Sequence, residues 1–121
     1  MERTVAFVCD HGAGKSRLAA AMFAAAGPRG WRATSAGLRP QETVSVHAAR
    51  LLAGNPAAEF LDVSPPSQFA PEAADVVVGI DCDIPRARRW KLASEWPAEQ
   101  ACEELRVLVS DLIAELRQRV S

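Results

Sequence analysis

A cysteine and a serine flank a glycine-containing turn near the start of the chain. The segment 9–16 reads CDHGAGKS and follows a short apolar run. A turn between a strand and a helix directs backbone N–H groups and the helix dipole toward an anion. A thiol beside that charge is more readily held as the thiolate, the form that attacks phosphorus or arsenic. The spacing therefore predicts an oxyanion site with Cys9 as its reactive thiol.

The other positions of this segment suit an anion cradle in different ways. Gly12 and Gly14 permit the backbone conformations that a cradle needs. Lys15 places a positive charge at the rim, and Arg17 is the next cation along the chain. Ser16 is either the N-cap of the following helix or a hydrogen-bond donor toward the loop. The residues expected to bind phosphate, sulfate or arsenate are Asp10, His11, Gly12, Ala13, Gly14, Lys15 and Arg17.

Two phosphate-binding patterns and one structural interpretation fit this loop. The nucleotide-binding pattern G-x4-G-K-[ST] is matched at its end, but its first glycine falls on Cys9, and only Asp81 is a candidate Mg²⁺ ligand. The cysteine-phosphatase pattern C-x5-R-[ST] is matched by Cys9 and Ser16, with Lys15 in place of arginine. A cysteine that ends a buried strand is also commonly a small hydrophobic residue. The loop alone leaves all three open.

The elements around the loop alternate between strands and helices. Segment 60–63 is either a short strand or a loop, 69–74 a short helix, and 81–99 a long loop with short helical pieces. Clear strands are predicted at 4–9, 31–35 and 75–80, and helices at 16–26, 44–53 and 98–120. This order predicts one domain over 1–121, a three-layer α/β/α sandwich with a central parallel sheet of about four strands. Ligands of such sheets bind beyond the carboxyl ends of the strands, where Cys9 lies.

Composition excludes several classes of function. The net charge is −1, with 14 basic and 15 acidic residues, so the basic excess of nucleic-acid binders is absent despite a local cluster at 86–91. The first apolar run is too short for a signal peptide or a membrane span, which favours a cytoplasmic protein without membrane contact. In that reducing compartment, three widely spaced cysteines indicate free thiols, metal ligands or redox chemistry rather than disulfides. With two histidines and no CxxC pair, we expect no metal site and no cofactor.

Several segments together resemble the low-molecular-weight protein tyrosine phosphatase superfamily, which also contains the thioredoxin-type arsenate reductases. The resemblance begins with FVC-x5-K-S before an alanine-rich helix. It continues in order through SAG at 35–37, VHAARLLAG at 46–54, ADVVV at 74–78 and WKLA at 90–93, over essentially the whole chain. The resemblance implies that Cys9 is the nucleophile, that loop amides and Lys15 hold the oxyanion, and that Ser16 stabilises the thiolate as a leaving group.

Three positions differ from the pattern of that superfamily. Lys15 stands for an arginine, which keeps the charge but loses a planar two-pronged contact. Gly12 stands for an asparagine that shapes the loop. Ser94-Glu95 stands for the Asp-Pro pair that carries the general acid, and a serine cannot supply a proton near neutral pH. The carboxylates that remain nearby are Glu95, Glu99 and Asp83.

The resemblance implies a phosphatase that acts through a cysteinyl-phosphate intermediate, with a phosphoprotein as one candidate partner. The first alternative is arsenate reduction, in which Cys82 or an external thiol resolves the Cys9 adduct. The second is an impaired relative that binds oxyanions without turnover, and a nucleotide kinase is the most distant. Trp90 and Trp96 are either walls of an aromatic substrate pocket or lids over the core.

Overall fold

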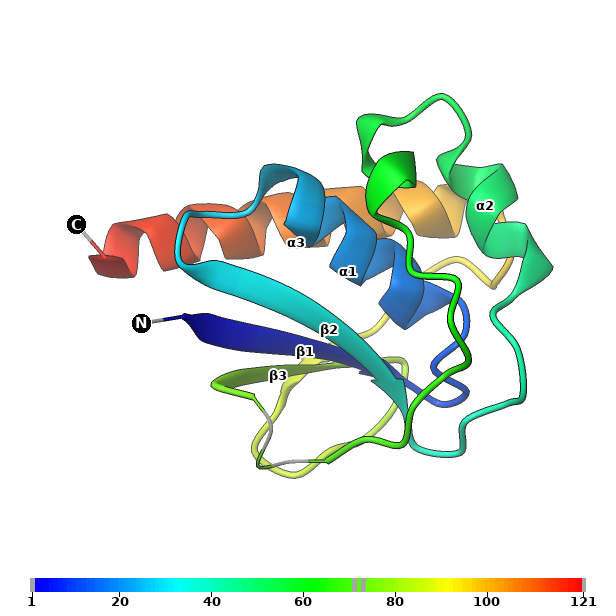
Figure 1. Cartoon of the computed structure of the whole chain (residues 1–121), viewed down its shortest axis with the longest axis horizontal. Helices are drawn as coiled ribbons and strands as arrows, with labels where there is room; N and C mark the ends of the chain where they lie inside the picture. Colours follow the sequence, from blue (N-terminus) through cyan, green and yellow to red (C-terminus); the bar gives the residue numbers. More distant parts are fainter. Residues whose placement is uncertain (1, 71, 73, 121) are drawn as a thin grey trace.

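The computed structural model describes residues 2–70, 72 and 74–120, and it is built on a four-stranded parallel sheet (Figure 1). The strands are β1 (Arg3–Cys9), β2 (Trp31–Gly37), β3 (Val76–Ile80) and β4 (Arg88–Trp90). They lie in the order β2-β1-β3-β4. The helices are α1 (Lys15–Ala26), α2 (Val46–Leu52), α3 (Glu99–Val120) and the short 3-10 helix η1 (Pro56–Phe60). The α/β class and the parallel sheet of four strands are as expected.

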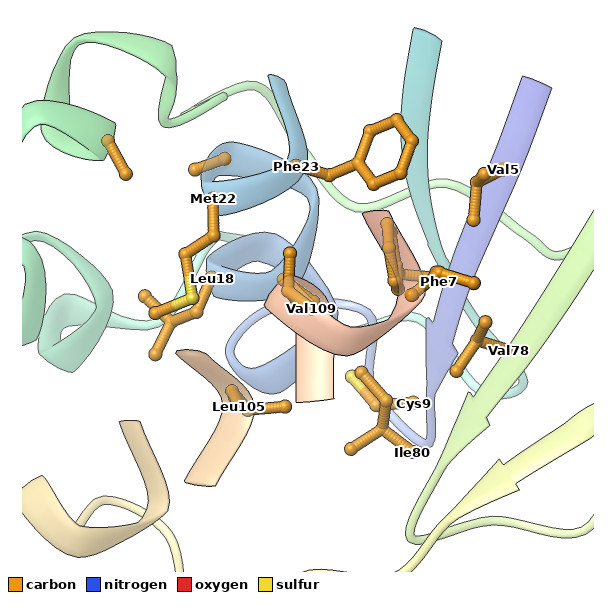
Figure 2. Close-up of a cluster of buried hydrophobic side chains, with 14 of the residues drawn as sticks. Val5, Phe7, Cys9, Leu18, Met22, Phe23, Val78, Ile80, Leu105 and Val109 are labelled. Carbon is orange, nitrogen blue, oxygen red and sulfur yellow. The ribbon is translucent and has the colours of Figure 1, made fainter. Parts of the chain in front are cut away.

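Strand β1 is central because its apolar run can be buried on both faces. It pairs with β2 from Arg3 to Cys9 and with β3 from Val5 to Val8. Val5, Phe7 and Cys9 belong to the main hydrophobic core, shown in Figure 2 together with residues of α1, α3 and β3. Burial of this strand therefore fixes Cys9 at the carboxyl edge of the sheet.

The helices α1 and α3 pack against each other on one side of the sheet, as Figure 1 shows. Leu18 and Phe23 of α1 are fully buried, and Leu105 and Leu116 continue the same core along α3. On the opposite face the covering layer includes irregular chain. A side-chain carbon at Gly79 would lie 3.4 Å from both Cys82 Sγ and Ile84 Cδ1. Residues 82–84 therefore pack directly on β3.

One expectation about the elements was wrong, because the fourth strand is β4, which lies within the segment expected to be a loop. Of the two alternatives for 60–63, the structure shows no strand: η1 ends at Phe60 and irregular chain follows. A three-residue edge strand containing Arg88 and Arg89 carries no apolar pattern, so sequence periodicity could not reveal it. The helix expected at 69–74 lies partly outside the described residues.

The described residues contain neither a membrane-spanning helix nor a cluster of metal-binding side chains. Within the described part of the chain, no helix combines the length and hydrophobicity needed to cross a bilayer. Among the same residues, no group of three or more His, Cys, Asp or Glu side chains is arranged to hold a metal ion.

Candidate oxyanion site at Cys9

The loop 10–14 between β1 and α1 is held in place by the chain that follows β2. Segment 38–45 runs alongside the loop, and its backbone N–H groups donate hydrogen bonds to loop carbonyls. The donors Leu38, Arg39, Gln41 and Ser45 bond the carbonyl oxygens of Cys9, Asp10, His11 and Ala13 at 2.7 to 3.2 Å. The carbonyls are thus turned toward segment 38–45.

The backbone N–H groups of the same loop remain unpaired. Within the described residues, no hydrogen bond to protein is donated by the N–H groups of residues 10–16. The N-cap of α1 is Gly14, and no side chain caps the helix. Because backbone donors seldom stay unpaired in a native structure, such a run of free donors is what an anion site requires.

Two glycines allow the loop to lie against the end of β2. Gly12 has φ of 65°, a conformation that L side chains rarely adopt. A side-chain carbon on Gly12 would lie 2.7 Å from the Gly37 nitrogen, and one on Gly37 would lie 2.7 Å from the Gly12 nitrogen. The SAG segment therefore brings a glycine to the point where β2 meets the loop.

The buried thiol of Cys9 lies next to a buried hydroxyl. Cys9 Sγ and Ser16 Oγ are 3.2 Å apart and hydrogen-bonded, and Ser16 is fully buried. Of the two roles expected for Ser16, the structure shows the contact toward the loop rather than the N-cap. A hydroxyl can rotate to donate to a thiolate or accept from a thiol.

Arg17 does not line the cavity at Cys9 but lies behind the loop. Its side chain is 2% exposed, and Nε donates to the Gly12 carbonyl at 3.1 Å while Nη1 donates to the Asp62 carbonyl at 2.6 Å. The expectation that Arg17 binds the oxyanion therefore does not fit this structure, because its guanidinium is used to hold the loop. Sequence spacing could not reveal this, since α1 turns adjacent side chains about 100° apart.

Lys15 reaches across the cavity to a residue at the end of β3. Its Nζ lies 2.7 Å from Asp81 Oδ2, and the two side chains are 22% and 23% exposed. Asp81 Oδ1 also accepts a hydrogen bond from the Leu92 N–H at 2.8 Å. The cation expected at the rim is therefore present and paired.

A cavity of about 360 Å³ opens above Cys9. It is lined by Cys9, Asp10, His11, Ala13, Gly14, Lys15, Gln41, Asp81 and Trp96. Trp96 packs on Gly14, where a side-chain carbon would lie 2.6 Å from the indole ring. A larger hollow of about 450 Å³ has no thiol, imidazole or carboxylate among its described lining residues, so we take the cavity at Cys9 as the candidate site.

The charge of Asp10, the residue after Cys9, is balanced by Arg39. Both Asp10 carboxylate oxygens accept hydrogen bonds from the Arg39 guanidinium, which lowers the pKa of Asp10. His11 is 56% exposed, and its Nδ1 lies 3.2 Å from the Arg39 carbonyl oxygen. Asp10 and His11 therefore contribute to the cavity wall without adding an uncompensated negative charge.

Cys82 lies near the end of β1, which carries Cys9, and Cys102 does not line the cavity. Cys82 Sγ donates to the Val8 carbonyl at 3.5 Å. Burial, and next the charge of Cys9, raise the pKa of Cys82. Cys102 instead donates to the Leu51 carbonyl at 3.8 Å, and burial raises its pKa.

The carboxylate of Glu104 in α3 binds the backbone of segment 91–97. Glu104 accepts hydrogen bonds from the N–H groups of Ala93 and Ser94, and the contacts with Ser94 lower the pKa of Glu104 more than any other cause. Ser94, at the position of the expected general acid, therefore faces Glu104. Neither Glu95 nor Glu99 lines the cavity, and Asp83 is paired with Arg89 at 3.0 Å.

No family model and no curated protein matches this sequence. Solved structures do match it. The thioredoxin-dependent arsenate reductase of Corynebacterium glutamicum has a TM-score of 0.78 at 20% identity, and the match covers 98% of this chain and 63% of that protein. A low-molecular-weight protein tyrosine phosphatase from Bacillus subtilis has a TM-score of 0.77 at 17% identity, covering 98% and 99% of the two chains. The chain has the fold of the low-molecular-weight phosphatase superfamily.

A third structure of the superfamily fold is an arsenate reductase described in its phosphate-binding state. It has a TM-score of 0.74 at 22% identity, and the match covers 95% of this chain and 98% of that one. Both activities are therefore found among proteins with this fold, and at these identities the likeness concerns the fold. The present chain spans less than two thirds of the Corynebacterium protein's length.

Three features of the site were not predicted from the superfamily pattern. Gln41 and the loop-binding segment 38–45 carry no motif. Asp81 was considered only as a metal ligand, although a polar residue directly after a buried parallel strand lies at the ligand-binding edge of the sheet. Its position directly after the strand is the feature of the sequence that could have indicated Asp81 as a cavity residue.

Proposed function

We propose that this chain is a phosphatase of the low-molecular-weight protein tyrosine phosphatase type, which hydrolyses phosphomonoesters through a phosphoryl group carried on Cys9. The main support is the combination of a buried thiol with the unpaired N–H groups of residues 10–16 at one end of a cavity. Such donors can hold the oxygens of a phosphoryl group and stabilise charge that develops during transfer. We place the protein in the cytoplasm, where its thiols stay reduced.

In the first step, the Cys9 thiolate attacks phosphorus and an S–P bond forms. The bond between phosphorus and the ester oxygen breaks, and its electron pair leaves with that oxygen, which takes up a proton. The loop N–H groups and the Lys15 ammonium hold the other phosphoryl oxygens. Lys15 can do so because its Nζ already lies at the cavity, 2.7 Å from Asp81.

In the second step, water attacks the phosphorus of phospho-Cys9. The S–P bond breaks, its electron pair returns to sulfur, and inorganic phosphate leaves. The Ser16 hydroxyl, 3.2 Å from Cys9 Sγ, donates a hydrogen bond to the departing thiolate. Because this contact is buried, we expect it to lower the barrier of this step.

Hydrolysis of p-nitrophenyl phosphate tests the proposal directly, because this ester has a good leaving group and needs little acid assistance. The wild-type protein is expected to release p-nitrophenol with turnover, and Cys9→Ser to abolish it. Cys102→Ser is the matched control, since Cys102 lies outside the cavity and should leave turnover unchanged. Absence of turnover in a folded wild-type protein would rule out the phosphatase.

Arsenate reduction is the second candidate, and it is favoured by the position of Cys82 beside the end of β1. In this reaction Cys9 forms an S–As bond with arsenate, and an arsenate oxygen leaves as water. A second thiol then attacks the Cys9 sulfur, a disulfide forms, and arsenic leaves as arsenite with the electron pair of the S–As bond. Thiol-dependent loss of arsenate would identify it. Cys82→Ser blocks turnover if Cys82 is the second thiol and leaves it unchanged if an external thiol acts.

An oxyanion-binding protein without turnover is the remaining candidate, because Ser94 offers no acid. Phosphate binding measured by calorimetry, without hydrolysis of p-nitrophenyl phosphate and without arsenate consumption, would identify it.

A further inference from the structure

Among the described residues, only two carboxylates line the cavity at Cys9, namely those of Asp10 and Asp81. Asp10 is bonded through both oxygens to Arg39, and this contact lowers its pKa, so it remains ionised. Asp81 is placed differently. It follows β3, faces Lys15 across the cavity, and keeps its second oxygen on the Leu92 N–H.

The carboxylates near the expected acid position are unsuited to the task. Glu104 binds two N–H groups of segment 91–97 and does not line the cavity. Asp83 is 81% exposed and paired with Arg89. Asp81 differs from these groups because its partner is the Lys15 ammonium at the cavity. An entering phosphoryl group would attract the same ammonium.

We propose that Asp81 is the general acid of the phosphatase reaction and replaces the acid missing at Ser94. This inference rests on the proposed function. Asp81 is paired with the Lys15 ammonium in the free protein, and a phosphoryl oxygen that takes over that ammonium leaves the carboxylate beside a dianion. The proton that Asp81 gives up in the reaction comes from the substrate monoanion or from solvent.

The proton then follows a closed cycle. When Cys9 attacks phosphorus, protonated Asp81 gives its proton to the leaving oxygen, so an alcohol or phenol departs and Asp81 is ionised. When water attacks phospho-Cys9, Asp81 takes a proton from that water and the phosphoryl group becomes inorganic phosphate. The same residue acts as acid and then as base, as a double-displacement reaction requires.

The test compares two esters that differ in their need for a proton. 2,4-Dinitrophenyl phosphate releases a weakly basic phenolate that leaves unaided, whereas phenyl phosphate releases a strongly basic one. Asp81→Asn keeps the shape of the side chain and an oxygen for the Leu92 N–H. We expect it to lower kcat/KM for phenyl phosphate by about 10²- to 10⁴-fold and to change that for the dinitrophenyl ester by less than about tenfold.

Asp83→Asn is the matched control, because Asp83 lies two residues further on and outside the cavity lining. It should leave both esters unaffected. An equal loss on both esters in Asp81→Asn would show that Asp81 only positions Lys15, and no loss on either would show that it is not needed. Both results would overturn the inference.

If Asp81→Asn does not fold, the unmodified protein still allows a result that would overturn the inference. Across a series of aryl phosphates, acid assistance predicts that kcat/KM changes little with the basicity of the leaving group. A steep fall across the series would overturn the role of Asp81 while leaving the phosphatase proposal intact. No turnover of any ester would contradict the phosphatase proposal itself.

Discussion

Replacement of Gly12 by alanine tests whether the loop depends on close contact with the end of β2. Gly12 has φ of 65°, and a left-handed conformation costs an alanine about 1–2 kcal/mol. The new methyl group would also lie 2.7 Å from the Gly37 nitrogen and 2.8 Å from the Ala36 carbonyl carbon. These neighbours are backbone atoms that cannot rotate away, so overpacking adds about 1–3 kcal/mol. We expect Gly12→Ala to be destabilised by about 2–5 kcal/mol.

Two other glycines provide controls for the conformational part of this cost. Gly30 and Gly54 have φ of 89° and 80°, and a side-chain carbon on either would meet nothing within 4 Å. Gly30→Ala and Gly54→Ala should therefore lose only about 1–2 kcal/mol. Urea unfolding followed by tryptophan fluorescence measures all three variants on one scale. If Gly12→Ala were no less stable than the two controls, the close contact between Gly12 and Gly37 would be refuted.

Two further predictions concern Arg17 and Cys82. Arg17→Met leaves the carbonyl oxygens of Gly12 and Asp62 without their donor and should lower the free energy of unfolding in urea by about 2–4 kcal/mol, of which Arg17→Lys recovers only part. Unchanged stability of Arg17→Met would contradict the role of Arg17 in holding the loop. Because burial and the charge of Cys9 raise the pKa of Cys82, Cys82 should react slowly with iodoacetamide at pH 8 and faster as the pH rises through its pKa. Cys9→Ser removes that charge, lowers the pKa of Cys82 and should speed its alkylation at pH 8 but not that of Cys102, as measured by peptide mass spectrometry. Equal alkylation rates of Cys82 before and after the change would refute the proximity of Cys9 and Cys82.

The sequence was most informative where local patterns decide the structure. The strand that ends at Cys9 is an apolar run and α3 has helical periodicity, so both elements were predicted close to their observed bounds. Strand β4 was missed because tertiary contacts rather than its own side chains define it. It pairs with β3, and Arg88 is bound to Glu115 of α3.

The site shows the same division between local and long-range information. The loop, the thiol and the adjacent hydroxyl follow from consecutive residues, and the structure brings Cys9 and Ser16 together. The positions of the cations depend on partners that are distant in sequence. Asp81 lies 66 positions after Lys15, and Asp62 lies 45 positions after Arg17. Spacing along the chain therefore could not show that Lys15 faces the cavity while Arg17 supports the loop from behind.

If Cys9 carries the phosphoryl group during turnover, trapping phospho-Cys9 demonstrates it. Wild-type protein is mixed with p-nitrophenyl phosphate, and the reaction is quenched within the first turnover. After digestion, mass spectrometry gives the mass of the peptide that contains Cys9. We expect one added phosphoryl group on Cys9, none on the Cys82 or Cys102 peptides, and none anywhere in Cys9→Ser. Hydrolysis of the ester without any phosphoryl group on Cys9, or a phosphoryl group on another residue, would show that Cys9 is not the phosphoryl carrier.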